Sequence, residues 1–467
     1  MLKLENINRV YFLGIGGIGM SALAQFFLQY GKKVFGYDLT PTEITHNLIK
    51  MGAVIHFNEN IAVIPDDIDL VIITPAIPKT HQEWLYFQEK NVPILKRSEV
   101  LGMICDSFPT IAVAGTHGKT TTTSIVTHFL KSIDYPTLAF IGGVSKNLDS
   151  NFLYTNNFQS VVVEADEFDR SFLTLYPKVG IITSVDADHL DIYGEKSKLV
   201  DSFQAFANQI DRDGTLIIAE KIADQINHPN KITYGEDDSA DFFVQINKME
   251  PHKTNFSICK KNGAETPICF QNLQLEAPGI HNLLNSLAAF LAVKELLRLR
   301  MVHENIAECN KIFSAFSSWK GVKRRFDFRI VQEDFVYIDD YAHHPEEIKA
   351  FLRAIKTIYP QKRVTGVFQP HLFSRTRDFA QEFGDALALL DEVILLEIYP
   401  ARELSIEGIT SAYLLDLIPH SQKRVLGKEE LIPYLKEHKP ELLLTIGAGD
   451  IDKLVPEIEK AFKNKKL

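Results

Sequence analysis

Short runs of β-branched and other apolar residues alternate three times along this chain with stretches whose apolar positions recur at helical spacing. Such alternation predicts parallel sheets with crossover helices. The first block covers about residues 1–107, the second 108–320 and the third 321–467. Within the second block, residues 242–275 alternate apolar and polar positions between polar turns, which predicts a small antiparallel sheet, and a helix is expected at about 281–299. The pattern therefore predicts three α/β domains.

Composition narrows the class of protein. A length of 467 residues agrees with three domains of roughly 150 residues each. With 45% apolar and 24% charged residues, the chain is neither disordered nor collagen-like. The net charge of −10 argues against a surface that grips a nucleic-acid backbone. No apolar run approaches the about 20 residues that span a bilayer, so no membrane insertion is expected.

The cysteines indicate a reducing compartment. Cys105, Cys259, Cys269 and Cys309 form no C-x-x-C pair, and they are too few for a disulfide framework in a chain of this length. The first residues, MLKLENINRV, do not read as a signal peptide. We therefore expect reduced thiols and a cytoplasmic location.

A glycine-rich loop follows the first apolar run. Residues 14–19 read Gly-Ile-Gly-Gly-Ile-Gly and precede a helical stretch, and Asp38 ends the next strand at the distance expected of a ribose-binding acid. Glycines let the backbone approach a pyrophosphate, and a helix N-terminus offers it free N–H groups. The loop predicts a nucleotide diphosphate but does not separate NAD from a nucleotide sugar.

A second loop opens the second block and carries the residues Gly115, Thr116, His117, Gly118, Lys119, Thr120 and Thr121. It departs from G-x-x-x-x-G-K-[ST], because Val113 stands where the first glycine is usual. The remaining Gly-x-x-Gly-Lys-Thr still suits ATP: backbone N–H groups wrap the phosphates, Lys119 reaches the β/γ oxygens and Thr120 can ligate Mg²⁺.

Acidic residues after later strands extend this site. Glu164 ends the strand SVVVEADE, where a phosphate-loop enzyme places a metal carboxylate, and His189 ends another strand. Thr120, Glu164 and His189 form the predicted metal set, although Mg²⁺ prefers oxygen ligands. The nearby acids are as compatible with solvated loops or helix caps as with function; they are Asp166, Glu167, Asp169, Asp188 and Asp191.

The third block carries two further polar clusters after strands. Asp340 and Tyr341 suit a ribose and a base, and they precede His343 and a Pro-Glu-Glu helix start. His371 and Arg375 follow the next strand, and a guanidinium can pair with a carboxylate or phosphate. The basic run 323–325 either contacts ATP phosphates or forms a solvated hinge.

Taken together, these motifs resemble the Mur ligases of peptidoglycan synthesis over essentially the whole chain. The resemblance rests on GIGGIGMSALA, AGTHGKTTTT, VVEADEFDRSFL, DADHLDIY, APGIHNLLNSLAA, WKGVKRRFDF, DDYAHHPEEI, FQPHLFSRTRDF and IGAGDI, in that order. It is nearest to the branch that adds L-alanine to UDP-N-acetylmuramate. It implies a Rossmann-like UDP-sugar domain (1–107), a central P-loop ATPase-like domain with a mainly parallel sheet plus a small antiparallel sheet (108–320), and a Rossmann-like C-terminal domain for amino acid and ATP (321–467).

The resemblance also implies roles for individual residues. It implies that Gly16, Gly17 and Gly19 face the diphosphate. Asp38, Thr74 and Ala76 are expected near the uridine or sugar, and Glu164 and His189 as metal ligands. The nucleotide is expected to contact His281, Asn282, Asn285, Arg324, Asp340 and Tyr341. His343, His371 and Arg375 are expected near the amino-acid and lactyl carboxylates, with Lys119 at the transferring phosphoryl group.

The implied reaction uses ATP and Mg²⁺ to convert the lactyl carboxylate into an acyl phosphate, which the amine of L-alanine attacks. We expect a monomer or weak homodimer. Thr74-Pro75 and Ser184 depart from the family pattern, and Asp201-Ser202-Phe203 stands where sister ligases have a carbamylated lysine, which the alanine-adding branch typically lacks. The alternatives are a murein tripeptide recycling ligase of the same family, a NAD-dependent oxidoreductase and a non-catalytic UDP-sugar sensor.

Overall fold

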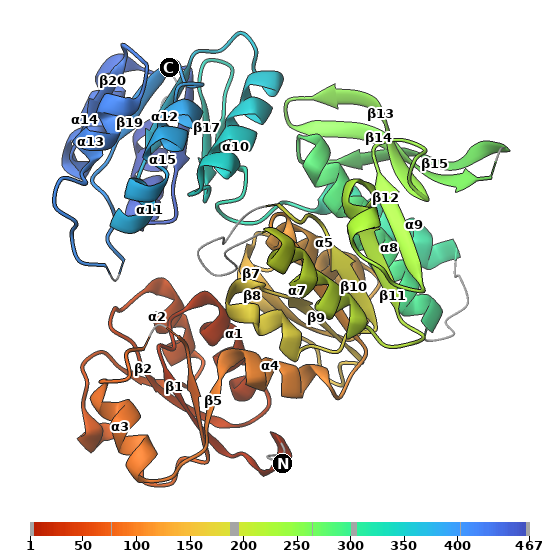
Figure 1. Cartoon of the computed structure of the whole chain (residues 1–467), viewed down its shortest axis with the longest axis vertical. Coiled ribbons are helices and arrows are strands. Elements are labelled where there is room, and N and C mark those ends of the chain that lie inside the picture. The colour runs from red at the N-terminus through yellow and green to blue at the C-terminus, as the bar shows by residue number, and fades with distance from the viewer. Residues whose placement is uncertain are drawn as a thin grey trace. The chain divides into compact units, whose positions relative to one another are not determined.

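The computed structural model describes residues 4–75, 77–186, 196–263, 265–299, 306–401 and 403–463. The chain divides into two compact units, Met1–Lys320 and Gly321–Leu467, and each is described by itself. The elements are coloured along the chain in Figure 1. No helix within the described ranges is long and apolar enough to cross a membrane.

The first unit begins with a five-stranded parallel sheet in the order β3-β2-β1-β4-β5. Its strands are β1 (Arg9–Leu13), β2 (Lys33–Tyr37), β3 (Val54–His56), β4 (Leu70–Ile73) and β5 (Ile94–Lys96). Its helices are α1 (Ile18–Gln29), α2 (Glu43–Lys50), α3 (Gln82–Glu89) and α4 (Arg97–Cys105), with short 3₁₀ turns η1 (Leu4–Asn6) and η2 (Ile61–Val63). Alternate residues of β1 enter two separate apolar cores, as expected of a parallel sheet covered on both faces.

The same unit continues into a ten-stranded mixed sheet in the order β15-β14-β13-β12-β11-β10-β6-β9-β7-β8. The strands are β6 (Thr110–Ala114), β7 (Thr137–Ser145), β8 (Ser150–Tyr154), β9 (Ser160–Glu164), β10 (Val179–Ile182), β11 (Thr215–Ala219), β12 (Lys231–Gly235), β13 (Phe242–Glu250), β14 (Lys253–Asn262) and β15 (Glu265–Leu275). The helices are α5 (Lys119–Ser132), α7 (Lys196–Asn208), α8 (Ile280–Leu299) and α9 (Ile306–Ser318), with 3₁₀ segments η3 (Phe168–Thr174) and η4 (Glu220–Gln225). The predicted antiparallel strands are present, but they extend the parallel sheet, because β12 pairs with β13 through two residue pairs.

The two sheets of this unit are joined by packing. Helix α1 lies against β7 and β8 (Figure 1). Asn151, in β8, is the polar link: its Oδ1 accepts a hydrogen bond of 3.2 Å from Gln25 Nε2, and its Nδ2 donates to the carbonyl of Ile18. The start of α1 is therefore fixed by a contact from the central sheet.

The second unit is a six-stranded sheet in the order β16-β17-β21-β18-β19-β20, parallel except for β16 against β17. The strands are β16 (Asp327–Val331), β17 (Val336–Asp340), β18 (Val364–Phe368), β19 (Glu392–Leu395), β20 (Lys423–Val425) and β21 (Leu442–Ile446). The helices are α10 (Pro345–Ile358), α11 (Phe373–Asp378), α12 (Ala380–Leu387), α13 (Ser411–Leu417), α14 (Lys428–His438) and α15 (Val455–Lys463), with the 3₁₀ turn η5 (Asp450–Leu454). Apolar cores lie on both faces.

The expectation that all cysteines are reduced is wrong for one pair. Cys259 in β14 and Cys269 in β15 are joined by a disulfide. The register of these antiparallel strands places the two residues directly opposite each other, with Cα atoms 4.0 Å apart. Cys105 is a buried free thiol, and Cys309 is not part of this disulfide.

Candidate active site

The glycine loop lies between β1 and α1, at the carboxyl edge of the five-stranded sheet. Asp38 closes this loop: its Oδ2 accepts a 2.7 Å hydrogen bond from the backbone N–H of Gly16, and its Oδ1 accepts one of 3.2 Å from Thr40 N–H. Each oxygen retains a second lone pair, so Asp38 can still accept from a hydroxyl group. Thr74 lies against the loop, with Cγ2 at 2.9 Å from the position that a Cβ on Gly14 would take. Ala76 lies outside the described residues.

Arg97 is a residue that the sequence reasoning missed. It begins α4 directly after β5, and its Nη1 lies 3.1 Å from the position that a Cβ on Gly19 would take. Within the described part of the chain, no carboxylate forms an ion pair with this half-buried guanidinium. The glycine at position 19 allows the arginine to approach the start of α1, where backbone N–H groups also attract anions. A basic residue immediately after a strand of the same sheet was the available signal.

The phosphate loop connects β6 to α5. Gly118, with φ of 82°, turns the chain into α5, which begins at Lys119. Ser184 supports the loop from the end of β10: its Oγ accepts a 2.9 Å hydrogen bond from His117 N–H and lies 2.8 Å from the Thr116 hydroxyl. Ser184, one of the positions that depart from the pattern of the resemblance, supports the phosphate loop through its hydroxyl.

Lys119 is held among acidic groups. Its Nζ donates to the carbonyl of Gly115 at 2.8 Å and to Glu167 Oε1 at 2.9 Å. Burial favours the neutral amine, but the carboxylates of Glu167, Asp166 and Glu164 outweigh that effect and raise the pKa of Lys119. Burial in turn raises the pKa of Glu167. The lysine is therefore a cation, and Glu167 is its partner rather than a solvated loop acid.

An oxygen pair lies beside the lysine. The hydroxyl of Thr120 donates a 2.8 Å hydrogen bond to Glu164 Oε2 at the end of β9. A hydroxyl and a carboxylate next to a phosphate loop are the ligands that suit Mg²⁺, so these two residues fit such an ion. The described residues contain no group of three or more His, Cys, Asp or Glu side chains that could hold a metal. Asp188, His189 and Asp191 lie outside them.

Helix α8 brings one predicted nucleotide residue to the phosphate loop. Asn285 Oδ1 lies 2.7 Å from the position that a Cβ on Gly118 would take. Asn282 instead donates through Nδ2 to the carbonyl of Pro278 at 2.7 Å, just before the helix begins. His281 lies over Gly279. Asn285 is thus placed against the phosphate loop.

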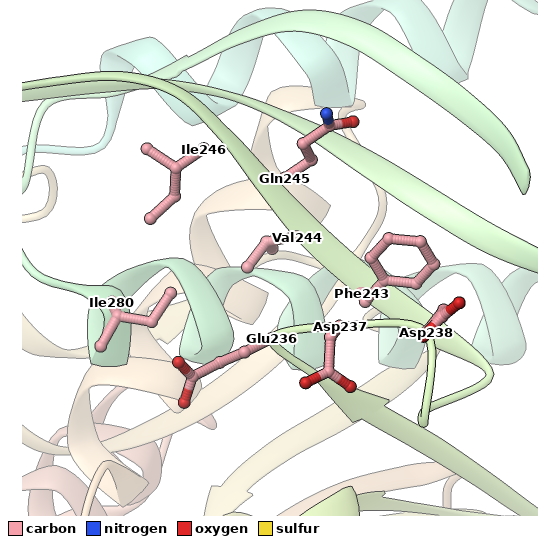
Figure 2. Close-up of a pocket in the computed structure, with 8 residues that line it drawn as sticks. All are labelled: Glu236, Asp237, Asp238, Phe243, Val244, Gln245, Ile246 and Ile280. Atoms are coloured by element: carbon pink, nitrogen blue, oxygen red, sulfur yellow. The ribbon is translucent and has the colours of Figure 1, made fainter.

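A cavity of about 420 Å³ lies near the start of α8 and contains none of the predicted site residues. Figure 2 shows its lining: the turn Glu236–Asp238, the β13 residues Phe243–Ile246, and Ile280. Its charged groups are carboxylates, and one of them, Glu236, pairs with Lys221 at 2.5 Å. Because the lining has no basic side chain, this cavity is unsuited to a triphosphate.

In the second unit, Asp340 organises the loop before α10. Its Oδ2 accepts from Phe326 N–H at 2.7 Å, and its Oδ1 accepts from Ala342 N–H at 2.8 Å. Burial raises the pKa of Asp340 to about 6, although those two hydrogen bonds and Arg325 oppose the shift. The guanidinium groups of Arg324 and Arg325 each lie 5.1 Å from the centre of the Tyr341 ring. The structure thus brings Arg324, Asp340 and Tyr341 together, as predicted.

His343, His371 and Arg375 form the other cluster of this unit. The imidazole rings of His343 and His371 are 6.1 Å apart in a T-shaped arrangement. Burial, together with the charge of Arg375, lowers the pKa of His343 and lowers that of His371 to about 4. His371 Nδ1 and Arg375 Nη1 are buried and have no hydrogen-bond partner within the described residues. Two neutral imidazoles beside a guanidinium with an unused donor suit a carboxylate ligand.

Comparisons with known proteins identify the family to which this chain belongs. Three family descriptions match in order: "Mur ligase family, catalytic domain" over residues 9–109, "Mur ligase middle domain" over 113–293 and "Mur ligase, glutamate ligase domain" over 324–449. The UDP-N-acetylmuramate–L-alanine ligase of Flavobacterium psychrophilum is 46% identical over 99% of this chain and 100% of its own length. The chain belongs to the Mur ligase family.

Other relatives of this Mur ligase agree in length and fold. The UDP-N-acetylmuramate–L-alanine ligase of Cytophaga hutchinsonii is 43% identical over 98% of this chain and 97% of its own. Among solved structures, the UDP-N-acetylmuramate-alanine ligase MurC of Thermotoga maritima has a TM-score of 0.79 at 26% identity, covering 98% of this chain and 100% of that one. A murein peptide ligase of Psychrobacter arcticus has a TM-score of 0.68 at 21% identity, covering 98% and 100%, and shares the fold.

Proposed function

We propose that this Mur ligase joins L-alanine to the lactyl carboxylate of UDP-N-acetylmuramate at the expense of ATP, in peptidoglycan precursor synthesis. The observation that carries the proposal is the full-length identity of 41–46% with relatives that bear this name. The phosphate loop with Lys119 and the cluster around Arg375 supply the two kinds of chemistry that such a ligase needs.

Residues 1–107 are proposed to bind the UDP-sugar. The backbone of Gly16, Gly17 and Gly19 faces the diphosphate, and Arg97 adds a positive charge beside it. Asp38 keeps the loop in shape through its bond to Gly16 N–H, while its remaining lone pairs are available to the nucleoside.

Residues 108–320 are proposed to bind ATP. Lys119 exchanges its contacts with Gly115 and Glu167 for the β- and γ-phosphate oxygens, and it offsets the repulsion between the phosphoryl group and the attacking lactyl carboxylate. Thr120 and Glu164 would hold Mg²⁺, which supplies further neutralisation of phosphate charge. Activation by phosphorylation is needed because a carboxylate does not react with an amine near neutral pH.

Residues 321–467 are proposed to bind the amino acid. Arg375 pairs with the carboxylate of alanine, and His371 lies between that carboxylate and the lactyl group. His343 is the proposed proton acceptor for the attacking amine. Its Nδ1 lies 3.2 Å from the Tyr341 carbonyl, so a proton on Nδ1 leaves the Nε2 lone pair free.

One coupled assay tests the function. Phosphate release from ATP should require both UDP-N-acetylmuramate and an amino acid, and in an amino-acid panel L-alanine should give the highest kcat/KM. Glycine should be a poor substrate, because a methyl group in a small pocket gains about 1–3 kcal/mol of discrimination. Faster turnover with the tripeptide L-alanyl-γ-D-glutamyl-meso-diaminopimelate than with alanine would instead indicate a recycling ligase.

A further inference from the structure

The residues around His371 are fixed by a strand-like segment that follows β19. Tyr399 N–H donates to the carbonyl of Pro370 at 2.8 Å, and Leu372 N–H donates to the carbonyl of Tyr399 at 3.0 Å. These bonds make His371 and Tyr399 a parallel bridge pair. Leu372 has φ of 71°, a left-handed conformation that a branched side chain rarely adopts and that the surrounding structure must hold in place.

The Tyr399 ring also contacts the imidazole itself. The rings of Tyr399 and His371 are stacked, with centroids 5.7 Å apart and planes inclined by 22°. His371 Nδ1 has no hydrogen-bond partner in the described part of the chain, so no hydrogen bond at that atom fixes the rotation of the ring. The stack with Tyr399 and the T-shaped contact with His343 are therefore the ring contacts that restrain the direction in which the imidazole points.

A third segment, which contains Gly449, packs against Tyr399. A Cβ on Gly449 would lie 2.7 Å from Tyr399 Cβ and would also collide with Gln369 Oε1. Gln369 joins the same segments: its Oε1 accepts from Ile451 N–H at 2.8 Å, and its Nε2 donates to Asp450 Oδ1 at 2.9 Å. The IGAGDI motif thus supplies a glycine where the Tyr399 side chain packs.

We propose that Tyr399 is a positioning residue of the active site, whose ring and backbone set the orientation of the His371 imidazole. This inference rests on the role proposed above for His371. The phenol hydroxyl is not required by it, because the stacked ring and the two backbone bonds make the contacts.

The test compares Tyr399→Phe, which keeps the ring, with Tyr399→Leu, which removes it. Tyr399→Phe should keep kcat within about twofold. Tyr399→Leu should lower kcat about ten- to a hundredfold, the cost of a misplaced catalytic group. The KM values for ATP and UDP-N-acetylmuramate should change less than twofold. Equal loss in both variants, or wild-type kcat in Tyr399→Leu, would overturn the proposal.

A double-mutant cycle separates this proposal from the proposed function. In a His371→Ala background, Tyr399→Leu should have no further effect, because the group that it positions is gone. If His371→Ala is fully active, the proposed role of His371 is wrong and the positioning role fails with it. If His371→Ala lowers kcat to a still measurable value and Tyr399→Leu lowers it further by the same factor as in the wild-type background, only the positioning role is wrong. Should Tyr399→Leu not fold by circular dichroism, Gly449→Ala displaces the same ring and should give the same selective fall in kcat; unchanged kcat in a folded Gly449→Ala would overturn the proposal.

Discussion

Lys119 is a buried cation whose charge is balanced by neighbouring protein groups. Its Nζ contacts the Gly115 carbonyl and the fully buried carboxylate of Glu167, so the cation is satisfied before any phosphate arrives. A buried ion pair of this kind is costly to break on one side, because the remaining charge is left without a partner. ATP phosphates can take the place of the carboxylate without leaving Lys119 unpaired.

Replacing Lys119 by alanine should lower kcat by about a hundredfold or more, because a charged donor to the transferring phosphoryl group is lost. The KM for UDP-N-acetylmuramate should stay within about twofold, since that ligand is assigned to residues 1–107. Steady-state kinetics with both substrates checks this. The matched control is Lys178→Ala, which removes a lysine paired with Asp211 and Asp213 elsewhere in the same unit and should leave kcat unchanged. Near-normal turnover in folded Lys119→Ala would contradict the assignment.

Arg375 is the residue proposed to bind the carboxylate of alanine. A planar guanidinium grips a carboxylate with two parallel bonds, and lysine cannot reproduce them. Arg375→Lys should therefore raise the alanine KM about tenfold or more and change the ATP KM little. Acyl phosphate formed without alanine, trapped by borohydride reduction, should persist in this variant. If trapping is lost together with ligation, Arg375 serves the lactyl carboxylate or the phosphorylation step instead.

At the scale of elements, the polar residues gather where parallel strands end. The glycine loop follows β1, the phosphate loop follows β6, and Asp340 ends β17. Ligands of open α/β sheets bind outside the carboxyl ends of the strands, where loops and helix N-termini meet. The start of α4 belongs to this set, because it places Arg97 against the glycine loop.

Arg97→Ala should raise the KM for UDP-N-acetylmuramate about ten- to a hundredfold, since one charged hydrogen bond to a diphosphate contributes about 1.5–3 kcal/mol. The ATP KM should be unaffected. Isothermal titration with UDP alone reports the same loss without catalysis. Arg9→Ala is the control, because Arg9 belongs to the same sheet and pairs with Asp67 at the surface. Equal UDP affinity in Arg97→Ala and wild type would remove Arg97 from the diphosphate site.

At the scale of the whole molecule, the two compact units carry different sets of groups. Met1–Lys320 holds the glycine loop, the phosphate loop and the Thr120–Glu164 pair, whereas Gly321–Leu467 holds the two neutral histidines and Arg375. The two histidines therefore make the stability of the second unit depend on pH. Burial is the main reason that the pKa of His371 lies near 4, and the neighbouring His343 and Arg375 lower it further.

Protonation of His371 should destabilise the second unit. His371 binds fewer protons folded than unfolded between pH 6.5 and about 4, so its contribution is complete above pH 6.5 and is lost as the pH falls toward 4. Asp340 acts in the opposite direction, because burial raises its pKa to about 6 and the folded state binds its proton first. Thermal unfolding of the full chain, followed by hydrogen exchange of the strands around the cluster, isolates the His371 contribution when wild type and His371→Asn are compared: the wild type should lose more stability toward pH 4 than the variant. The same acid response in this variant would show that His371 does not cause it.

The sequence alone determined the alternation of strands and helices, the three blocks, the helix after residue 280 and the Gly-Lys-Thr junction that opens α5. These features depend on contiguous residues, because apolar periodicity and loop motifs are local properties of the sequence. From the resemblance it also placed His343, His371 and Arg375 in one group, and the structure brings the rings of His343 and His371 to 6.1 Å of each other.

Only the tertiary structure decided which partner each polar group takes. Asp38 bonds the glycine loop, Glu167 pairs with Lys119, Arg97 reaches Gly19, Cys259 faces Cys269, and Tyr399 stacks on His371. Most of these pairs join residues that are tens of positions apart. Strand order and register bring them together, and neither is encoded in the local pattern of apolar and polar positions. Burial likewise follows from packing, so the lowering of the His371 pKa to about 4 could not be derived from the sequence alone.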